Sequence, residues 1–371
     1  ACAPLAALAP DLVLVFGSVA LLRQAGDRAA VRAAFPGALL AGCSTGGEIA
    51  GAVVEDGTCV VAALRLDDTA VQVVTTAMAG PEDSLAAGLR LGQALLAGAP
   101  QPPAAVLLFG RGTAMNGSAL IDGLTAAVGH AVPVCGGLAG DDGAFRDTLV
   151  IGPQDGEAPA AVAVGFHGDR FRLQVGSFGG WQPFGPTRRV TRADGNILYS
   201  LDGEPALDVY RRYLGDHAAG LPATGLLFPF EMLCAEAMSQ GTIRTILGID
   251  EAAGSLLLAG DVEEGGLLRM MAAGTDALVD GAERAAAACL EPAPAPWAAL
   301  ALLVSCVGRK LVMGDRVDEE VEAVLDTLGA GAGGDLAVAG FYSYGELGPH
   351  SQAAGCRLHN QTMTVAVLGE A

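Results

Sequence analysis

The stretch Gly340-Phe-Tyr-Ser-Tyr-Gly-Glu346 decides the fold that we predict for this chain. Its seven-residue frame has glycine first, glycine sixth and an acid seventh, and the same frame occurs near the N-terminus as Gly42-Cys-Ser-Thr-Gly-Gly-Glu48. A looser copy, Gly136-Gly-Leu-Ala-Gly-Asp-Asp142, keeps the first glycine and the final acid. A frame that recurs in this way indicates internal repeats.

The segments around the three glycine-rich stretches also repeat. An apolar run of strand length and then a helix-like segment precede each stretch; the three runs are Leu12–Phe16, Ala105–Phe109 and Ala299–Val304. Another apolar run follows each stretch; these are Cys59–Leu66, Ala160–Phe166 and Thr362–Leu368. We therefore predict three degenerate copies of strand, helix, strand, loop, strand, although any α/β sequence can give this pattern by chance.

Length and composition favour a chain of two domains. At 371 residues one compact domain is unexpected, and we predict an α/β (α+β) fold with mixed sheets flanked by helices, divided into domains 1–206 and 207–371. The longest apolar run, around Ala298 to Val307, is too short to span a membrane. The net charge of −20 argues against nucleic acid and anionic membranes as partners.

Cysteine usage favours a reducing compartment. The eight cysteines are scattered singly and form no Cys-x-x-Cys pair, so the sequence indicates neither a zinc ribbon nor a disulfide framework. The cytoplasm is the simplest compartment for such a chain. The high glycine and alanine content is typical of a bacterial protein from a high-GC genome.

Three local patterns add detail to the predicted repeats. The segment from Val19 to Phe35 has the spacing of one amphipathic helix. Asp56-Gly57 predicts a hairpin that joins Ala52–Val54 to Cys59–Leu66. A helix is expected from about Asp315 to Leu328, with an acidic outer face.

Several familiar catalytic motifs are matched only in part. Gly42-Cys-Ser-Thr-Gly46 has the letters of Gly-x-Ser-x-Gly, but a nucleophile elbow requires a following helix and the next segment is strand-like. Phe109-Gly-Arg-Gly112 lacks the Lys-Ser/Thr ending of a phosphate-binding loop. Cys356-Arg-Leu-His359 has metal-ligand spacing but no second pair, and Asp141-Asp142 either caps a turn or binds a hard cation.

The densest cluster of unusual residues is C-terminal. We predict that its polar side chains line an open ligand pocket at adjacent strand ends; they are Arg309, Tyr342, Tyr344, Glu346, His359, Asn360 and Thr362. The other glycine-rich stretches add Ser44, Glu48, Asp141 and Asp142 to the candidate ligand-binding set. Arg309, which interrupts a buried strand pattern, is suited to holding a ligand carboxylate. The alternative is an internal Arg309–Glu346 salt bridge, with the other polar groups satisfying one another.

These strings also resemble the FIST family. Three parts of the chain resemble the FIST N-terminal domain: the stretches at 42–48 and 136–142, and Val190-Thr191 through Asp202-Gly-Glu-Pro-Ala206. Four other parts resemble the FIST C-terminal domain: Tyr210-x-x-Tyr-Leu-Gly215, Cys306-x-Gly-Arg309, the stretch at 340–346 and His359-Asn-Gln-Thr-Met363. The resemblance covers nearly the whole chain and implies intracellular signal transduction by a sensory module that binds small ligands, amino acids being the usual proposal.

The residues and the resemblance leave three hypotheses. The first is a non-catalytic sensor of an amino-acid-like ligand, without metal or cofactor, acting on a signalling partner and with a homo-oligomer left open. The second rests on similar bacterial members that bind haem, sense nitric oxide and act on a histidine kinase; His359 would be the axial ligand and His350 the second choice. The third is an enzyme that uses Glu48, Asp142 and Glu346 as acids or bases.

Overall fold

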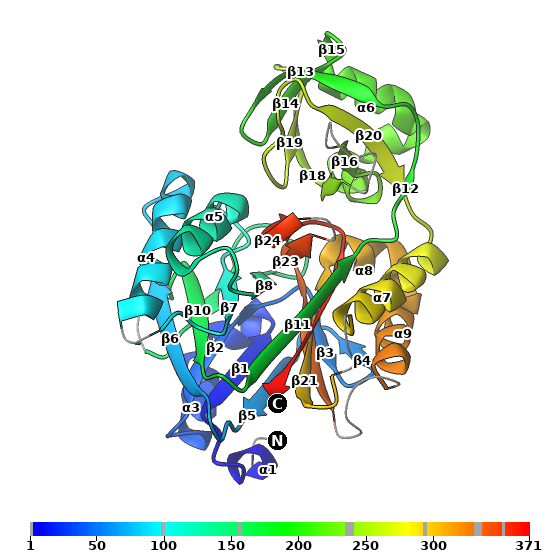
Figure 1. The fold of residues 1–371 in the computed structure, drawn as a ribbon. Coiled ribbons are helices and arrows are strands. Elements are labelled where there is room, and N and C mark those ends of the chain that lie inside the picture. Colours follow the sequence, from blue (N-terminus) through cyan, green and yellow to red (C-terminus); the bar gives the residue numbers. More distant parts are fainter. Residues whose placement is uncertain are drawn as a thin grey trace.

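The computed structural model describes residues 3–97, 99, 101–154, 158–233, 241–291, 295–329, 336–350 and 353–371. Figure 1 shows two parts: a body made of three sheets with helices outside them, and a smaller upper lobe. Among the described residues, no helix combines the length and the apolar character that a membrane crossing requires.

Each of the three sheets of the body is built around one of the predicted repeats. In order across the first sheet lie β5 (Cys59–Leu64), β1 (Leu12–Gly17), β2 (Leu39–Ser44) and β9 (Val150–Ile151). The second contains β24 (Ala353–His359), β23 (Gly345–His350), β8 (Val134–Leu138), β7 (Ala105–Gly110), β10 (Ala161–His167) and β6 (Ala70–Thr76). The third contains β11 (Phe171–Phe178), β25 (Met363–Glu370), β21 (Ala298–Cys306), β22 (Ala337–Ser343), β3 (Glu48–Ala50) and β4 (Val53–Glu55).

Strand pairing confirms the predicted repeats. In each one the first strand is parallel to the second and antiparallel to the last: β1 lies between β2 and β5, β7 between β8 and β10, and β21 between β22 and β25. The first glycine of each seven-residue frame lies at the same register position. A Cβ there would stand about 2 Å from a carbonyl oxygen of the neighbouring strand; the pairs are Gly42 with Val15 (1.9 Å), Gly136 with Leu108 (2.0 Å) and Gly340 with Leu303 (2.1 Å). Only glycine allows this approach.

The repeats exchange strands around a ring. The strand that follows each glycine-rich loop leaves its own sheet and pairs with the second strand of another repeat: β3 with β22, β9 with β2, and β23 with β8. The predicted hairpin across Asp56-Gly57 is therefore wrong. β4 pairs with β3 in the third sheet, whereas β5 returns to β1 in the first, so the two segments belong to different sheets.

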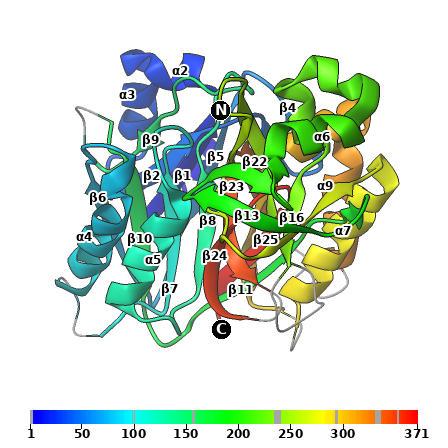
Figure 2. The same ribbon diagram turned by 90° about the horizontal axis from the view of Figure 1, so that it is seen from above.

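One central core lies between the three sheets. Alternate residues of the innermost strands point into it, and Phe16, Phe109 and Phe341 meet there with ring centroids 4.6–6.1 Å apart. Helices cover the outward faces (Figure 2), namely α2 (Val19–Arg23) with α3 (Ala25–Ala34), α4 (Ser84–Ala97) with α5 (Gly117–Val128), and α7 (Thr275–Cys289) with α9 (Asp318–Gly329). Two short helices complete the body, α1 (Ala3–Ala6) and α8 (Val307–Met313).

The single helix predicted from Val19 to Phe35 is in fact two. Gln24 has an extended backbone (φ −70°, ψ 112°), so it ends α2 and begins α3. Ser18 caps α2 through a side-chain hydrogen bond from the N–H of Leu21. Short 3-10 helices occur at Pro81–Asp83, Gly215–Gly220, Ala223–Leu227 and Gly314–Arg316.

The upper lobe comprises residues 182–272 and has its own core around Tyr210, Phe230 and Leu256. Its sheet runs through β17 (Thr242–Arg244), β16 (Phe230–Leu233), β20 (Leu267–Ala272), β13 (Arg188–Asp194), β14 (Ile197–Leu201), β19 (Ser255–Leu258) and β18 (Ile246–Asp250). Beside it lie β12 (Gln182–Pro183), β15 (Glu204–Pro205) and α6 (Ala206–Leu214). The lobe is inserted between β11 and α7, so the body contains both ends of the chain, and the boundary predicted after residue 206 falls within the lobe.

Candidate functional site

Arg309 is enclosed rather than exposed to a pocket. β21 ends at Cys306 and α8 begins at Val307, so Arg309 lies on a helix and does not interrupt the strand. Both its side chain and that of Glu320 are 0% exposed. Nε and Nη2 of Arg309 donate to Oε2 of Glu320 at 2.9 and 2.7 Å, Nη2 also donates to Leu278 O at 2.8 Å, and Nη1 donates to Gly179 O. Neither the open pocket at Arg309 nor the alternative Arg309–Glu346 salt bridge is formed.

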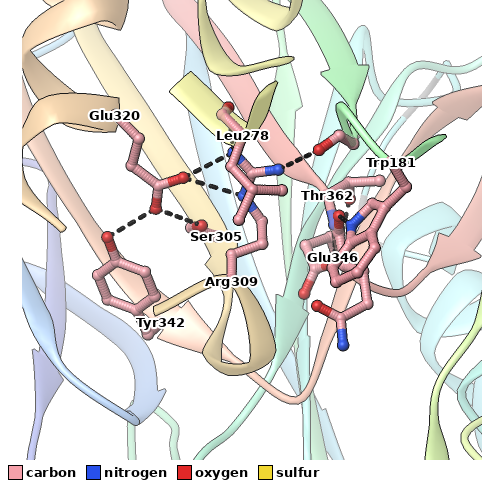
Figure 3. Close-up of polar contacts among 10 residues, drawn as sticks. Trp181, Leu278, Ser305, Arg309, Glu320, Tyr342, Glu346 and Thr362 are labelled. Atoms are coloured by element: carbon pink, nitrogen blue, oxygen red, sulfur yellow. Dashed lines mark hydrogen bonds and ion pairs between the residues drawn. The ribbon is translucent and has the colours of Figure 1, made fainter. Parts of the chain in front are cut away.

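Glu320 joins Arg309 to Tyr342 (Figure 3). Its Oε1 accepts hydrogen bonds from the Tyr342 hydroxyl at 2.7 Å and from Ser305 Oγ at 2.8 Å. Burial, followed by the Glu320 carboxylate, raises the pKa of Tyr342 well above its usual value. The prediction of an acidic outer face on the helix overlooked Glu320, which turns inward beside the buried residues Val324 and Leu328. The spacing of these three residues, four apart, was a signal for an inward face.

Glu346 belongs to a second buried network. Its Oε1 accepts from Ser343 Oγ at 2.6 Å, and its Oε2 accepts from the N–H and the hydroxyl of Thr362 at 3.1 and 3.0 Å. Burial raises the pKa of Glu346 to about 7, while the hydrogen bonds from Ser343 and Thr362 oppose that rise. Both carboxylate oxygens are thus occupied by donors of the protein.

Glu48 repeats this arrangement in the first repeat. Thr45 Oγ1 donates to its Oε1, while the N–H and the hydroxyl of Thr58 donate to its Oε2 at 2.8 and 2.7 Å. Burial, with a smaller effect from Asp142, raises the pKa of Glu48. In the second repeat Ala139 replaces the hydroxyl residue, and Asp142 is exposed with a left-handed backbone (φ 57°). In two repeats of the three, the final acid of the frame is therefore buried and joins the loop to the closing strand by hydrogen bonds.

The three glycine-rich loops meet in a ring of backbone hydrogen bonds. The N–H of Gly46 donates to Tyr342 O at 2.7 Å, that of Gly140 to Ser44 O at 2.9 Å, and that of Tyr344 to Leu138 O at 3.0 Å. These donors occupy the fifth position of the frame and the acceptors the third. Ser44 Oγ donates to Gly140 O and accepts from Leu149 N–H, so it too belongs to the ring.

Asp141 caps a turn, which was one of its two predicted roles. Its carboxylate accepts from the N–H groups of Phe145, Arg146 and Asp147, each at 2.8 Å, and from the Tyr344 hydroxyl. The ring of Phe145 stacks on that of Tyr344 with centroids 4.2 Å apart. Within the part of the chain that the structure describes, no group of three or more His, Cys, Asp or Glu side chains could hold a metal ion.

A cavity lined by both polar and apolar residues lies where the upper lobe meets the body, and we call it the junction cavity. It has a volume of about 60 Å³. The lining residues come from the end of β11 and the connection after it, from the lobe, and from the turn between β24 and β25; they are Ser177, Phe178, Gly179, Gly180, Trp181, Glu231, Gly241, Ile243, Met271, His359 and Thr362. Of the predicted ligand-binding residues, His359 and Thr362 are among them.

The junction cavity brings an acid, an imidazole and an indole together. Glu231 is buried and accepts from Arg269 Nε at 2.5 Å and from Gly241 N–H at 2.8 Å. His359 is 6% exposed, with Nε2 3.2 Å from Gly348 O. Trp181 donates from Nε1 to Gln361 O at 2.8 Å. The prediction omitted Glu231 and Trp181 because the sequence places them far from the C-terminal cluster.

The turn between β24 and β25 ties the lobe to the body. Gln361 has a left-handed backbone (φ 63°), and its Nε2 donates to Leu226 O of the lobe at 2.9 Å. Asn360 and Gln361 are almost fully buried, yet Asn360 Oδ1 and Gln361 Oε1 have no hydrogen-bond partner among the described residues. Buried oxygen atoms that lack a hydrogen-bond donor are uncommon in folded proteins.

His359 does not fit the role of a haem ligand. Its ring is buried, and its Nε2 lies 3.2 Å from the carbonyl of Gly348, so this nitrogen is directed at the protein backbone. The second choice, His350, has a side chain that lies outside what the structure describes.

Comparison with protein families agrees with the motifs. The model of the FIST N domain matches residues 11–204, and that of the FIST C domain matches residues 206–349. The chain belongs to the FIST family. FIST domains are associated with sensory signal transduction and with the binding of small ligands. The two matches meet next to the boundary at 206, whereas the spatial division of the FIST protein sets residues 182–272 apart.

Relatives match this FIST protein over very different shares of its length. An uncharacterized protein of Mycobacterium tuberculosis is 28% identical over 377 residues, which cover 97% of this chain and 91% of that protein. An uncharacterized protein of Methanocaldococcus jannaschii is 37% identical over 84 residues, which cover 22% of this chain and only 15% of that protein.

Two solved structures show a distant likeness. A chorismatase has a TM-score of 0.35 at 10% identity, covering 97% of this chain and 92% of its own. A cyanuric acid hydrolase from A. caulinodans has a TM-score of 0.19 at 17% identity, covering 81% of this chain and 99% of its own. Both scores are below 0.5, so neither likeness identifies a fold or a function.

Proposed function

We propose that this FIST protein is a sensor that binds a small amino-acid-like ligand in the junction cavity and does not act on it as an enzyme. The observation that carries the proposal is the position of the cavity: polar side chains of the lobe and of the body face one space between them. A ligand held there contacts both parts at once.

The polar groups of the junction cavity complement a zwitterion. The carboxylate of Glu231 is an acceptor for an ammonium group, which would share it with Arg269. The hydroxyl of Ser177, whose oxygen lies 2.9 Å from that of Thr364, is a donor for a carboxylate, and the rings of His359 and Trp181 are walls of the cavity.

The size of the cavity links binding to movement of the lobe. A space of about 60 Å³ holds a few water molecules, so an amino acid enters only if the lobe moves away from the body. The lobe is connected to the body through two short segments, residues 179–181 and 273–274. Differential binding to the open and closed arrangements would shift their populations, and a signalling partner such as a histidine kinase would read the position of the lobe.

The other predicted residues support a role in stability rather than in catalysis. Ser44, Glu48 and Glu346 use their oxygens to hold the glycine-rich loops and the closing strands together. A nucleophile or general base needs a reactive atom that faces the substrate. These three side chains are instead fully engaged with the protein.

Thermal unfolding in the presence of each amino acid tests the proposal. A ligand at about one hundred times its dissociation constant should stabilise the protein by roughly 2.7 kcal/mol. Glu231→Gln should abolish that shift for the ligand that gives it. The matched control is Glu204→Gln, which removes another arginine-paired carboxylate of the same lobe at the surface and should leave the shift intact. A flat response across all amino acids contradicts the proposal.

A further inference from the structure

A second and larger cavity lies in the first repeat, between the sheet and the helices α2 and α3. Its volume is about 300 Å³. Apolar side chains make up most of its wall; they include Val15, Leu40, Val61 and Ile151 from the strands and Leu22 and Val31 from the helices. It shares no lining residue with the junction cavity.

The other repeats show how this space arises. In the second repeat α4 and α5 pack at backbone contact, since a Cβ at Gly88 would stand 2.1 Å from Leu120 O and one at Gly123 would stand 2.1 Å from Leu85 O. The third repeat also has two long helices, α7 and α9, on its outer face. Among the described residues of the first repeat, the short α2, the ten-residue α3 and the single turn of α1 cover that face. The cavity lies between these helices and the sheet.

One cation of the cavity wall is available to a ligand. Arg32 uses its guanidinium to hold the carbonyl groups of Pro153 and Gly152 at 2.6 and 2.8 Å. Arg28 also lines the cavity and is half-buried, and its guanidinium makes no hydrogen bond or ion pair with any residue that the structure describes. In a chain with a net charge of −20, an arginine side chain without a described partner beside an apolar cavity points to an anionic ligand.

We propose that this cavity is a second binding site, which takes a small apolar monocarboxylate. The hydrocarbon part lies against the valine and leucine side chains, and the carboxylate accepts hydrogen bonds from Arg28. Ligand pockets are typically apolar spaces of 300 Å³ or more with a few well-placed polar groups.

Octanoate is the probe, and Cys59 reports on its binding. The exposed thiol of Cys59 lines the cavity, so a bound ligand should slow its alkylation by iodoacetamide, as followed by peptide mass spectrometry. Octanoate should also raise the melting temperature. Arg28→Gln should weaken octanoate binding by about tenfold or more, because a charge-assisted hydrogen bond is lost, and should leave the weaker binding of octanol unchanged.

Two further variants complete the test. Arg23→Gln removes the same charge from the neighbouring helix, but Arg23 pairs with Asp147 outside the cavity, so octanoate binding should persist. Val31→Phe fills the cavity and should weaken the binding of octanoate and of octanol alike. If that variant does not fold, the comparison of Arg28→Gln with Arg23→Gln still tests the proposal. The proposal is overturned if millimolar octanoate changes neither the melting temperature nor the alkylation rate of Cys59. It is also overturned if Arg28→Gln and Arg23→Gln weaken octanoate binding equally.

Discussion

Glu48 and Glu346 occupy equivalent positions in the first and third repeats, and the same set of donors holds each carboxylate. In both cases a hydroxyl residue three positions earlier binds one oxygen, and the threonine before the closing strand binds the other through its N–H and its hydroxyl. Where the frame has a hydroxyl residue at its fourth position and glutamate at its seventh, buried hydrogen bonds therefore join a loop to the closing strand. Burial of these carboxylates makes stability depend on pH.

Stability should fall between pH 4.5 and 7 because of Glu346. Its pKa is about 7 in the folded protein against an ordinary value of 4.5, so the folded state holds the proton more tightly. The resulting stabilisation is complete below pH 4.5 and is lost as the pH rises to about 7. Glu346→Gln should remove this decline, which amounts to roughly 3 kcal/mol in the free energy of unfolding.

Urea unfolding of the wild type and of Glu346→Gln from pH 4.5 to pH 8 measures this difference. The matched control is Glu82→Gln, which changes an exposed glutamate in the same way and should follow the wild type. Parallel pH profiles for the wild type and Glu346→Gln would show that the buried carboxylate is not titrating in this range.

Glu320→Gln should destabilise the protein strongly. The substitution leaves the fully buried guanidinium of Arg309 without its counter-charge, and breaking a buried ion pair in this way costs about 3–5 kcal/mol. Glu319→Gln is the matched control, because the adjacent residue pairs with Arg316 at the surface, where such pairs contribute about 1 kcal/mol or less. Equal urea midpoints for the two variants would falsify the buried network.

The repeats predict equal effects at three glycines. Gly42→Ala, Gly136→Ala and Gly340→Ala each force a methyl group against a carbonyl oxygen, so each should lower the free energy of unfolding by about 1–3 kcal/mol. Gly37→Ala is the control, because a Cβ there meets no atom within 4 Å. If one of the three substitutions is tolerated like the control in urea unfolding, that position is not equivalent to the others.

The repeats were predictable because their signal is local. A glycine is required wherever two strands approach within contact of a Cβ, so Gly42, Gly136 and Gly340 mark the same place in each copy. Strand exchange between repeats was not predictable in the same way. Hydrophobic periodicity identifies a strand such as β3 but not its partner, and β22 lies almost 300 residues away.

The candidate site was predicted only in part, and the reason is again distance along the chain. The sequence marked the C-terminal cluster as unusual, but Arg309 pairs with Glu320 and not with Glu346. Periodicity alone does not say whether an acid on a helix faces solvent or an arginine. Glu231 and Trp181 join His359 through contacts between the lobe and the body, which no local pattern specifies.

Hydrogen exchange with the amino acid that stabilises the protein most tests the central proposal of a junction site. At a saturating concentration, amide exchange should slow in the segments 177–181, 241–243 and 359–362, which come from both sides of the junction cavity. Protection confined to other segments, or a protein that no amino acid stabilises, would contradict the proposal.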